Sequence, residues 1–221
     1  MITVYLTSYE LQPDKKKQKL EHEIGLLLLQ KGLKEQFQLS LEVDKLKEGM
    51  KTGEHGKPYL CDYENIHFNI SHCKGLVACA LSDEPIGLDV EQIQDIKDSL
   101  PKRVLSKEEQ EFLAEYREDE AQYLELFFRF WTLKESYIKW DGRGFSKEPR
   151  DISFELDLSK DPVEITFSDK EDLDKKDLNK EDMRQKVLGF YQKKIKDKYF
   201  LTVCSRQLSE HKNIQIFKED F

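Results

Sequence analysis

Three acidic residues stand at positions where carboxylates could act together on a ligand. Asp89 and Glu91 lie in segment 86–91, whose apolar residues alternate with the others, so a strand would place both carboxylates on one face. Glu135 lies in a helical segment, on the same stripe as Phe128 and Trp131. A carboxylate on an apolar stripe is costly unless it is paired. Three carboxylates without a His or Cys cluster favour a hard divalent cation, and Mg²⁺ is the ion that we expect.

Each of these carboxylates also has a purely structural explanation. Asp89 and Glu91 could lie on the solvated face of an edge strand, and Glu135 could form an ion pair with Lys139, four residues further along the helix. Lys134 and Lys139 flank Glu135 at the two margins of the apolar stripe. Two cations beside a buried carboxylate favour a metal–phosphate site over an isolated ion pair.

A second group of polar residues precedes the carboxylates. Residues 56–58 (Gly-Lys-Pro) combine a turn with a cation, and residues 68–72 (Phe-Asn-Ile-Ser-His) end an expected strand with a hydroxyl and an imidazole. Lys57, Ser71 and His72 could grip a phosphate through charge and hydrogen-bond donors, although a lone His is more often structural. The sequence contains neither a P-loop nor a glycine-rich dinucleotide fingerprint.

Composition narrows the class of protein. The chain has 221 residues with a net charge of −8, which argues against general nucleic-acid binding. Its four cysteines form no Cys-x-x-Cys pair and are expected to be thiols of a reducing compartment. The N-terminal segment does not resemble a signal peptide, and the longest purely apolar run, 26–29, is too short to span a membrane. We therefore expect a cytoplasmic protein that does not bind membranes.

The elements that would hold these residues can be predicted from periodicity and turn signals. Ser106 and Glu109 form a capping-box pattern, and Gly142 would stop a long helix. The mixed-charge run 169–186 is expected to be a solvated loop or a short exposed helix. The remaining predictions are strands at 2–8, 67–71, 76–81, 86–91, 152–157, 163–167, 187–195, 199–205 and 214–218, helices at 14–37 and 120–140, and a loop at 49–58. This order predicts two α+β halves with a boundary near 92–101.

Four segments, taken together and in order, are similar to a known family. Segments 56–58, 68–72, 87–91 and 131–139 resemble the motifs of 4′-phosphopantetheinyl transferases of the surfactin-synthetase-activating (Sfp) type. Each motif alone is modest, but the ordered set is highly specific. The resemblance is close over residues 56–145 and loose outside them.

The resemblance implies a fold and a reaction. The fold would be α+β (α/β), with two similar α/β halves, 1–97 and 98–221, related by a pseudo-twofold axis and with coenzyme A in the cleft between them. The reaction would move the phosphopantetheine arm of coenzyme A to a serine of an acyl or peptidyl carrier protein. The second product would be adenosine 3′,5′-bisphosphate. A cleft within one chain would allow a monomer.

The resemblance also implies roles for individual residues. The metal ligands for Mg²⁺ would be Asp89, Glu91 and Glu135, and the catalytic residues would be Glu135 and Lys139. Glu135, or a metal-bound water near it, would accept the proton of the carrier serine. Coenzyme A would be bound at its phosphates by Lys139 and Lys134, and at its nucleotide end by Lys57, Pro58, Ser71 and His72.

One part of the chain departs from the family pattern, and two other functions compete with the first. Longer members carry an Arg-containing N-terminal helix at the nucleotide, whereas no Arg precedes Arg103 here. Lysines within 15–19 could substitute, or could form a solvated cluster. The alternatives are a non-catalytic adaptor that binds coenzyme A or the carrier, and another Mg²⁺-dependent phosphotransferase or hydrolase. The carrier is expected to dock near 100–130, a stretch that includes Arg103 and Lys107.

Overall fold

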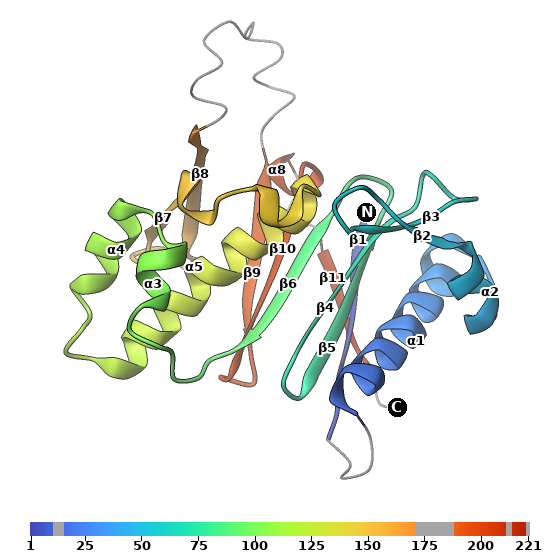
Figure 1. Ribbon diagram of the computed structural model, residues 1–221, viewed down its shortest axis with the longest axis horizontal. Coiled ribbons are helices and arrows are strands. Elements are labelled where there is room, and N and C mark those ends of the chain that lie inside the picture. The colour runs from blue at the N-terminus through green and yellow to red at the C-terminus, as the bar shows by residue number, and fades with distance from the viewer. Residues whose placement is uncertain (11–15, 171–187, 211–213, 220–221) are drawn as a thin grey trace, which may run out of the picture.

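The computed structural model describes residues 1–10, 16–170, 188–210 and 214–219, and Figure 1 shows the course of the chain. The strands are β1 (Ile2–Ser8), β2 (Met50–Thr52), β3 (Pro58–Leu60), β4 (His67–Cys73), β5 (Leu76–Ser82), β6 (Gly87–Gln92), β7 (Ile152–Asp157), β8 (Glu164–Asp169), β9 (Gly189–Ile195), β10 (Tyr199–Ser205) and β11 (Ile214–Lys218). The helices are α1 (Lys17–Phe37), α2 (Val43–Gly49), α3 (Leu100–Val104), α4 (Lys107–Ala114), α5 (Glu120–Asp141) and α8 (Gln207–Glu210), with 3₁₀ turns η1 (Gly144–Ser146) and η2 (Pro149–Asp151).

Two sheets carry the architecture, which is of the mixed α+β type. The first has the strand order β11-β1-β5-β4, and the second has the order β6-β10-β9. All neighbouring strands in them are antiparallel except β1 and β11, which are parallel. The hairpins β2-β3 and β7-β8 form two further small sheets.

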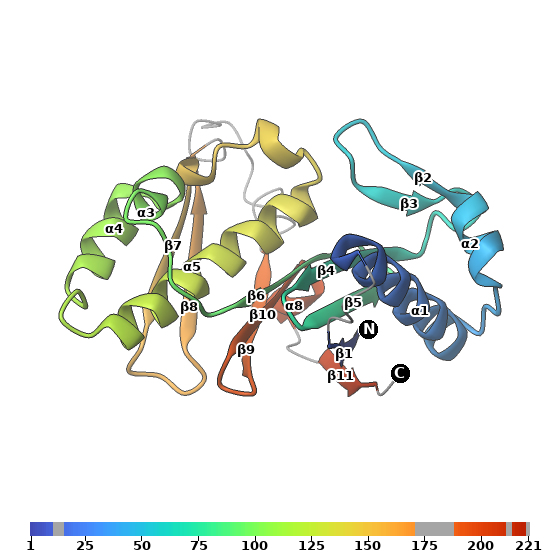
Figure 2. The same cartoon turned by 60° about the horizontal axis from the view of Figure 1, so that its bottom comes forward.

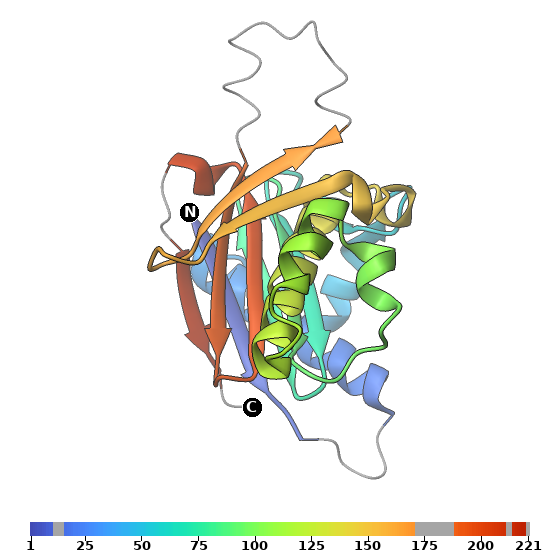
Figure 3. The ribbon, with the colours of Figure 1, turned by 90° about the vertical axis from the view of Figure 1, so that its left-hand side faces the viewer.

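Both large sheets bury one face against each other and the other face under a long helix. Alternating side chains of β1, β6 and β10, such as Val4, Val90 and Leu201, form a shared apolar cluster. Helix α1 packs its leucines on the far side of the first sheet, and α5 packs its phenylalanines on the second. Figure 2 shows β4 and β6 running between these two helices. In Figure 3 the orange β7-β8 hairpin crosses the red strands β9 and β10.

Most predicted elements are confirmed, with one difference and two segments outside the described residues. The predicted loop 49–58 contains β2 and the first residue of β3, because the chain reverses at Gly53 and Gly56 and pairs Met50 with Leu60. The start of the predicted helix 14–37 and most of the run 169–186 lie outside the described residues. No helix in the described ranges is long and apolar enough to cross a membrane.

The predicted halves exchange strands across their boundary. Strand β6 precedes residue 97 but pairs with β10, and β11 follows it but pairs with β1. The division of the chain at this point stays a prediction. The exchange places β6 beside β4, so the two sheets face each other where the candidate site lies.

Candidate active site

Helix α5 and strand β6, which carry the predicted carboxylates, pack against each other. Asp119 caps the start of the helix, where its carboxylate accepts a hydrogen bond from the Gln122 amide at 3.0 Å, and Gly142, whose φ of 80° favours glycine, caps its end. Strand β6 approaches the helix so closely at Gly87 that an added Cβ would collide with the Ser136 carbonyl oxygen. The glycine of segment 87–91 therefore brings Asp89 and Glu91 up to the helix that carries Glu135.

Asp89 is the most enclosed of the three acids. Its side chain is 5% exposed, and its Oδ1 accepts hydrogen bonds from Lys139 Nζ at 2.7 Å and Ser71 Oγ at 3.0 Å. Its Oδ2 is buried and has no hydrogen-bond partner among the described residues. An unpartnered buried carboxylate oxygen is unfavourable unless a cation or a donor satisfies it. This atom therefore fits a metal ligand.

Glu91 and Glu135 flank Asp89 in a region of low solvent access. Burial raises the pKa of Glu91 to about 7, and the charge of Asp89 adds to the shift. Burial likewise raises the pKa of Glu135 to about 7, again with a contribution from Asp89. The Trp131 indole donates a 3.3 Å hydrogen bond to Glu91 Oε1. Mutual repulsion of this kind is expected where three carboxylates share a site for a divalent cation.

The three acids do not form a finished metal site. In the described part of the chain no group of three His, Cys, Asp or Glu side chains is arranged to hold a metal ion. Glu91 instead accepts a hydrogen bond from Trp131, and Asp89 accepts one from Lys139. The donor set is nevertheless all oxygen, as Mg²⁺ requires, and it includes the free Asp89 Oδ2. The residues therefore fit the ion through the chemistry of their oxygen donors and the buried, unpartnered Asp89 Oδ2.

Lys134 does not reach this site, and the prediction that it contacts phosphate is wrong. Its ammonium group is fully buried, lies 2.7 Å from Glu109 Oε2, and donates to the carbonyl oxygens of Pro149 and Ile152. Glu109 in turn accepts hydrogen bonds from the amides of Ser106 and Phe154. Lys134 lies on the side of α5 that faces β7, whereas Lys139 lies on the side that faces β6.

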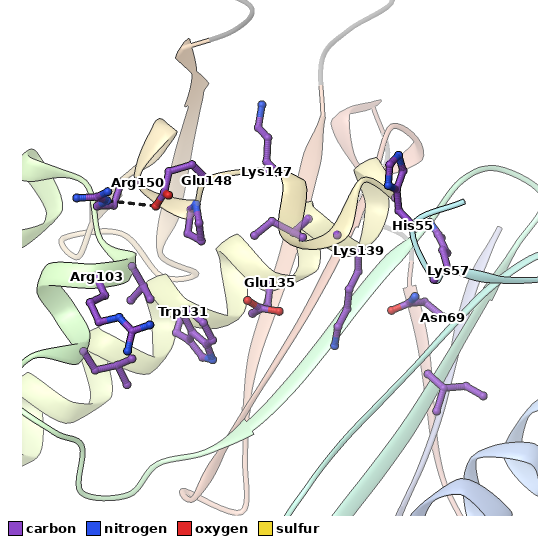
Figure 4. A pocket seen from close by; sticks show the side chains of 18 of the residues that line it. His55, Lys57, Asn69, Arg103, Trp131, Glu135, Lys139, Lys147, Glu148 and Arg150 are labelled. Atoms are coloured by element: carbon purple, nitrogen blue, oxygen red, sulfur yellow. Dashed lines mark hydrogen bonds and ion pairs between the residues drawn. The ribbon is translucent and has the colours of Figure 1, made fainter. Parts of the chain in front are cut away.

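A cleft of about 760 Å³ opens beside the carboxylates. Figure 4 shows Trp131, Glu135 and Lys139 along α5, with Lys57 and Asn69 on the opposite wall. The cleft is lined by more cationic than acidic side chains, although the chain as a whole is acidic. The cationic ones are Lys57, Lys102, Arg103, Lys139, Lys147 and Arg150, and the acidic ones are Glu135 and Glu148. Such a lining suits an anionic ligand of considerable size.

The residues predicted for a nucleotide do not all face this cleft. Lys57 and Pro58 line it, but Lys57 Nζ also donates to the carbonyl oxygens of Ile86 at 3.0 Å and Trp140 at 3.2 Å. Burial lowers the pKa of Lys57 to about 8. Ser71 is turned toward Asp89, as described above.

His72 follows Ser71 in β4 and therefore points to the opposite face of the strand. Its Nδ1 lies 3.4 Å from Glu21 Oε2 on α1, and Glu21 also accepts a hydrogen bond from the Tyr9 hydroxyl. The His72 side chain is 46% exposed. It is therefore open to solvent at the edge of the sheet, but outside the wall that the cleft presents.

Several cleft residues were missed by the sequence interpretation. Asn69 lies in the same segment as Ser71, and its Oδ1 accepts a hydrogen bond from the Leu88 amide at 3.0 Å, which joins β4 to β6. Arg103 was assigned to docking, yet it lines the cleft. His55 and Arg150 come from the β2-β3 turn and from η2. Only Asn69 carried a usable signal, since it belongs to a recognised motif.

Comparison with known proteins places these features in a family context. The model of the 4′-phosphopantetheinyl transferase superfamily matches residues 85–204. This range contains β6 and α5, and therefore all three carboxylates and Lys139.

Individual relatives that are named phosphopantetheinyl transferases match this chain over different lengths. The 4′-phosphopantetheinyl transferase Sfp of Bacillus subtilis (strain 168) is 37% identical over 139 residues, which cover 62% of this chain and 58% of that protein. The 4′-phosphopantetheinyl transferase HetI of Nostoc sp. is 38% identical over 98 residues, or 42% of this chain and 40% of that protein. The L-aminoadipate-semialdehyde dehydrogenase-phosphopantetheinyl transferase of Rattus norvegicus is 28% identical over 206 residues, or 86% of this chain and 63% of that protein. The chain thus spans less than two thirds of each of these relatives.

Proposed function

Because this chain belongs to the 4′-phosphopantetheinyl transferase superfamily, we propose that it transfers the phosphopantetheine arm of coenzyme A to a serine of a carrier protein. The relatives in the comparison bear the name of this activity. The observation that carries the proposal is the pairing of Asp89 with Lys139, which together with Glu135 lines a cation-rich cleft. Phosphoryl-group transfer depends mainly on charge neutralisation and alignment, and this site offers both.

Asp89, Glu91 and Glu135 are the residues that would hold Mg²⁺. The ion, when bound, would neutralise charge on the pyrophosphate of coenzyme A. Lys139 lines the cleft next to these acids and has a flexible stem, so its ammonium group can contact the same pyrophosphate. Lys134 is excluded from this set by its buried pair with Glu109.

The other accessible cations of the cleft would bind the 3′-phosphate of coenzyme A, whereas Lys147 is buried beside Asp169. We assign the nucleotide end to the wall formed by Lys57 and Pro58, and extend it along β4 to Ser71 and His72. The exposed His72 would meet a phosphate at the edge of the sheet rather than inside the cleft. Arg103 and Lys102, on the opposite wall, supply further cations. They would compensate for the absence of arginine from helix α1.

The transfer step needs a base for the carrier serine. The serine oxygen attacks the phosphorus that bears the pantetheine arm, a new P–O bond forms, and the bond to the bridging oxygen of the pyrophosphate breaks. Adenosine 3′,5′-bisphosphate leaves with that oxygen. Glu135 accepts the serine proton, and its pKa of about 7 suits a base that works near neutral pH.

Two further features belong to this proposal. We propose that the halves of the molecule are related by a pseudo-twofold axis, because each has a long helix, α1 or α5, on the outer face of a mainly antiparallel sheet. We also propose that one chain suffices for activity, since Lys57, Glu135 and Lys139 line a single cleft and Asp89 contacts Lys139. The acidic carrier would approach the α3 side, where Lys102 and Arg103 lie at the cleft. Four unpaired cysteines agree with action in the cytoplasm.

Intact-protein mass spectrometry of an apo carrier protein tests the function. The carrier is incubated with this chain, coenzyme A and Mg²⁺, with a chelator in the control reaction. We expect a gain in carrier mass of one phosphopantetheine arm that disappears with the chelator. No gain with several acyl and peptidyl carriers, while coenzyme A still binds, would refute the transferase and favour an adaptor. Release of the bisphosphate without a carrier would instead indicate a hydrolase.

A further inference from the structure

Lys139 makes two contacts that its proposed role in phosphate binding does not require. Its Nζ lies 2.7 Å from Asp89 Oδ1 and 2.9 Å from Ser71 Oγ. The Ser71 hydroxyl donates to the same Asp89 oxygen and accepts a hydrogen bond from the Val90 amide at 3.2 Å. Lys139, Ser71 and Asp89 therefore form a closed triad that joins α5, β4 and β6.

The triad satisfies only half of the Asp89 carboxylate. Oδ1 has two donors, while Oδ2 is buried without a hydrogen-bond partner among the described residues. The side chain of Asp89 is 5% exposed, and that of Lys139 is 28% exposed. A carboxylate as enclosed as this one needs a nearby positive charge, and Lys139 supplies it.

Lys139 is also able to leave this position. It lines the cleft, it is the more exposed partner of the pair, and its four-carbon stem gives the ammonium group a wide reach. A second cation at Asp89 Oδ2 would repel the ammonium group at short range, in surroundings that screen charge poorly. Release of Lys139 toward the cleft would relieve that repulsion and add a positive charge where an anionic ligand binds.

We infer that Lys139 is the internal counter-cation of Asp89, and that a divalent cation competes with it for this carboxylate and releases it into the cleft. Ser71 acts as a positioning residue, because it holds both partners of the pair. The inference rests on the proposed function only for the identity of the anion that the released lysine meets. By reciprocity, a pyrophosphate in the cleft should in turn strengthen cation binding.

Mn²⁺ binding to the free protein tests this competition without coenzyme A or a carrier. Lys139→Met removes the internal cation, so we expect Mn²⁺ to bind at least about tenfold more tightly, as measured by electron paramagnetic resonance. In a chelator, the same variant should melt below the wild type, and Mn²⁺ should raise its melting temperature by more. The transferase rate of Lys139→Met should fall even though its metal binding improves.

Two further variants make the result specific. Lys194→Met is the matched control, because Lys194 also forms an ion pair, with Glu125 at 2.6 Å, and its side chain is 30% exposed. This pair joins β9 to the N-terminal part of α5, away from Asp89. The control removes the same charge and should leave Mn²⁺ affinity unchanged. Lys139→Arg keeps the cation and should bind Mn²⁺ as weakly as the wild type does.

Addition of inorganic pyrophosphate measures the coupling. It should tighten Mn²⁺ binding in the wild type and have a clearly smaller effect in Lys139→Met. Equal or weaker Mn²⁺ binding by Lys139→Met, compared with Lys194→Met, would overturn the inference. If Lys139→Met folds only with Mn²⁺, that dependence supports the inference. If the wild type is an active transferase but Lys139→Met binds Mn²⁺ no more tightly, the competition is refuted and the transferase stands. If Lys139→Met binds Mn²⁺ more tightly but the wild type transfers nothing, the transferase is refuted and the competition stands.

Discussion

The ammonium group of Lys134 lies 2.7 Å from the Glu109 carboxylate, and neither side chain is exposed to solvent. Burial lowers the pKa of Lys134 and raises that of Glu109, while the charge of each partner opposes these shifts. Lys134 also donates hydrogen bonds to the carbonyl oxygens of Pro149 in η2 and Ile152 in β7. Glu109 accepts one from the Phe154 amide in β7. It therefore connects α4 and α5 to one wall of the cleft.

Lys134→Met should destabilise the fold strongly. Removal of one partner leaves the Glu109 charge buried and uncompensated, so we expect the free energy of unfolding to fall by about 3–5 kcal/mol. Urea unfolding followed by circular dichroism measures this change. The double variant Lys134→Met/Glu109→Gln should lose less than the sum of the two single variants.

An exposed ion pair provides the comparison for this result. Lys107 lies 3.7 Å from Glu111, and both side chains are more than two thirds exposed, at 86% and 70%. Lys107→Met should leave the unfolding midpoint unchanged, because solvent screens such pairs. Equal effects of Lys107→Met and Lys134→Met would contradict the role assigned to the buried pair.

Divalent-cation binding should weaken as the pH falls. Glu91 and Glu135 have pKa values of about 7, so protons compete with the cation below that pH. If one of them must lose its proton, affinity should drop by about tenfold between pH 8 and pH 6, and by more if both must. Titration calorimetry with Mg²⁺ at pH 6, 7 and 8 gives this dependence. An affinity that is constant over the range would show that neither carboxyl group is a ligand.

The same groups predict how the stability of the chelator-treated protein depends on pH. Their pKa values are about 7 in the folded chain, above the 4.5 of an unperturbed glutamate, so folding takes up protons between these pH values. Their contribution therefore reduces stability as the pH rises from about 4.5 to about 7. Glu135→Gln removes one of the two groups and should flatten this part of the curve, which thermal melts across the pH range would reveal.

Gly87→Ala should disrupt the contact between β6 and α5. The new methyl group would collide with the Ser136 carbonyl oxygen and lie 2.6 Å from the Trp140 amide nitrogen, and backbone atoms cannot move aside easily. We expect a loss of about 2 kcal/mol or more in the free energy of unfolding. Gly49→Ala is the matched control, because nothing lies within 4 Å of its added Cβ. Similar melting temperatures for the two variants would contradict the close approach.

Glu135→Gln tests the proposed base, and the assay uses saturating Mg²⁺ because the variant also lacks a proposed metal ligand. The amide keeps the size of the side chain but is not a base, so we expect the turnover number to fall about a hundredfold or more. Coenzyme A affinity should change little. In the wild type the rate should decline as the pH falls, because protonation of Glu135 removes the base. A variant that binds metal and coenzyme A normally and keeps near-wild-type turnover would exclude Glu135 as the base.

Trp131 should report ligand binding by fluorescence. The chain has two tryptophans, of which Trp131 lines the cleft, while the Trp140 ring stacks on Tyr137. We expect coenzyme A to change the emission of the wild type and of Trp140→Phe. The change should be lost in Trp131→Phe. A response that follows Trp140 instead would place the ligand elsewhere.

The parts of the site that could be predicted are those set by local periodicity. Alternation predicts that Asp89 and Glu91 share a face of β6, and helical spacing predicts one stripe of α5 for Glu135 and Lys139; of these four, Asp89 and Lys139 are in direct contact. Their metal and phosphate roles stay proposals. The strands and long helices were predictable for the same reason, because each follows one clear period.

The errors concern residues whose partners are distant in sequence. Spacing on α5 could not show that Lys134 turns toward Glu109, which belongs to another helix. The segment around Lys57 likewise gave no sign that its ammonium group reaches the carbonyl oxygens of Ile86 and Trp140. The β2-β3 hairpin was missed because its strands have only 3 residues each, too few to display a period. Tertiary contacts decided each of these cases.

The parallel pairing of β11 with β1 has a consequence for how the molecule assembles. Ile2 and Ile214 are partners in this pair, so it joins residues that are almost a whole chain apart. Closing so large a loop costs conformational entropy, which must be lost before the contact can stabilise the chain. We therefore expect β11 to pair with β1 late in folding. Because each sequence half also donates a strand to the sheet of the other, neither half contains a complete core. The two halves should therefore unfold as one cooperative unit. Residues 1–97 and 98–221, expressed as separate fragments, should not each be soluble.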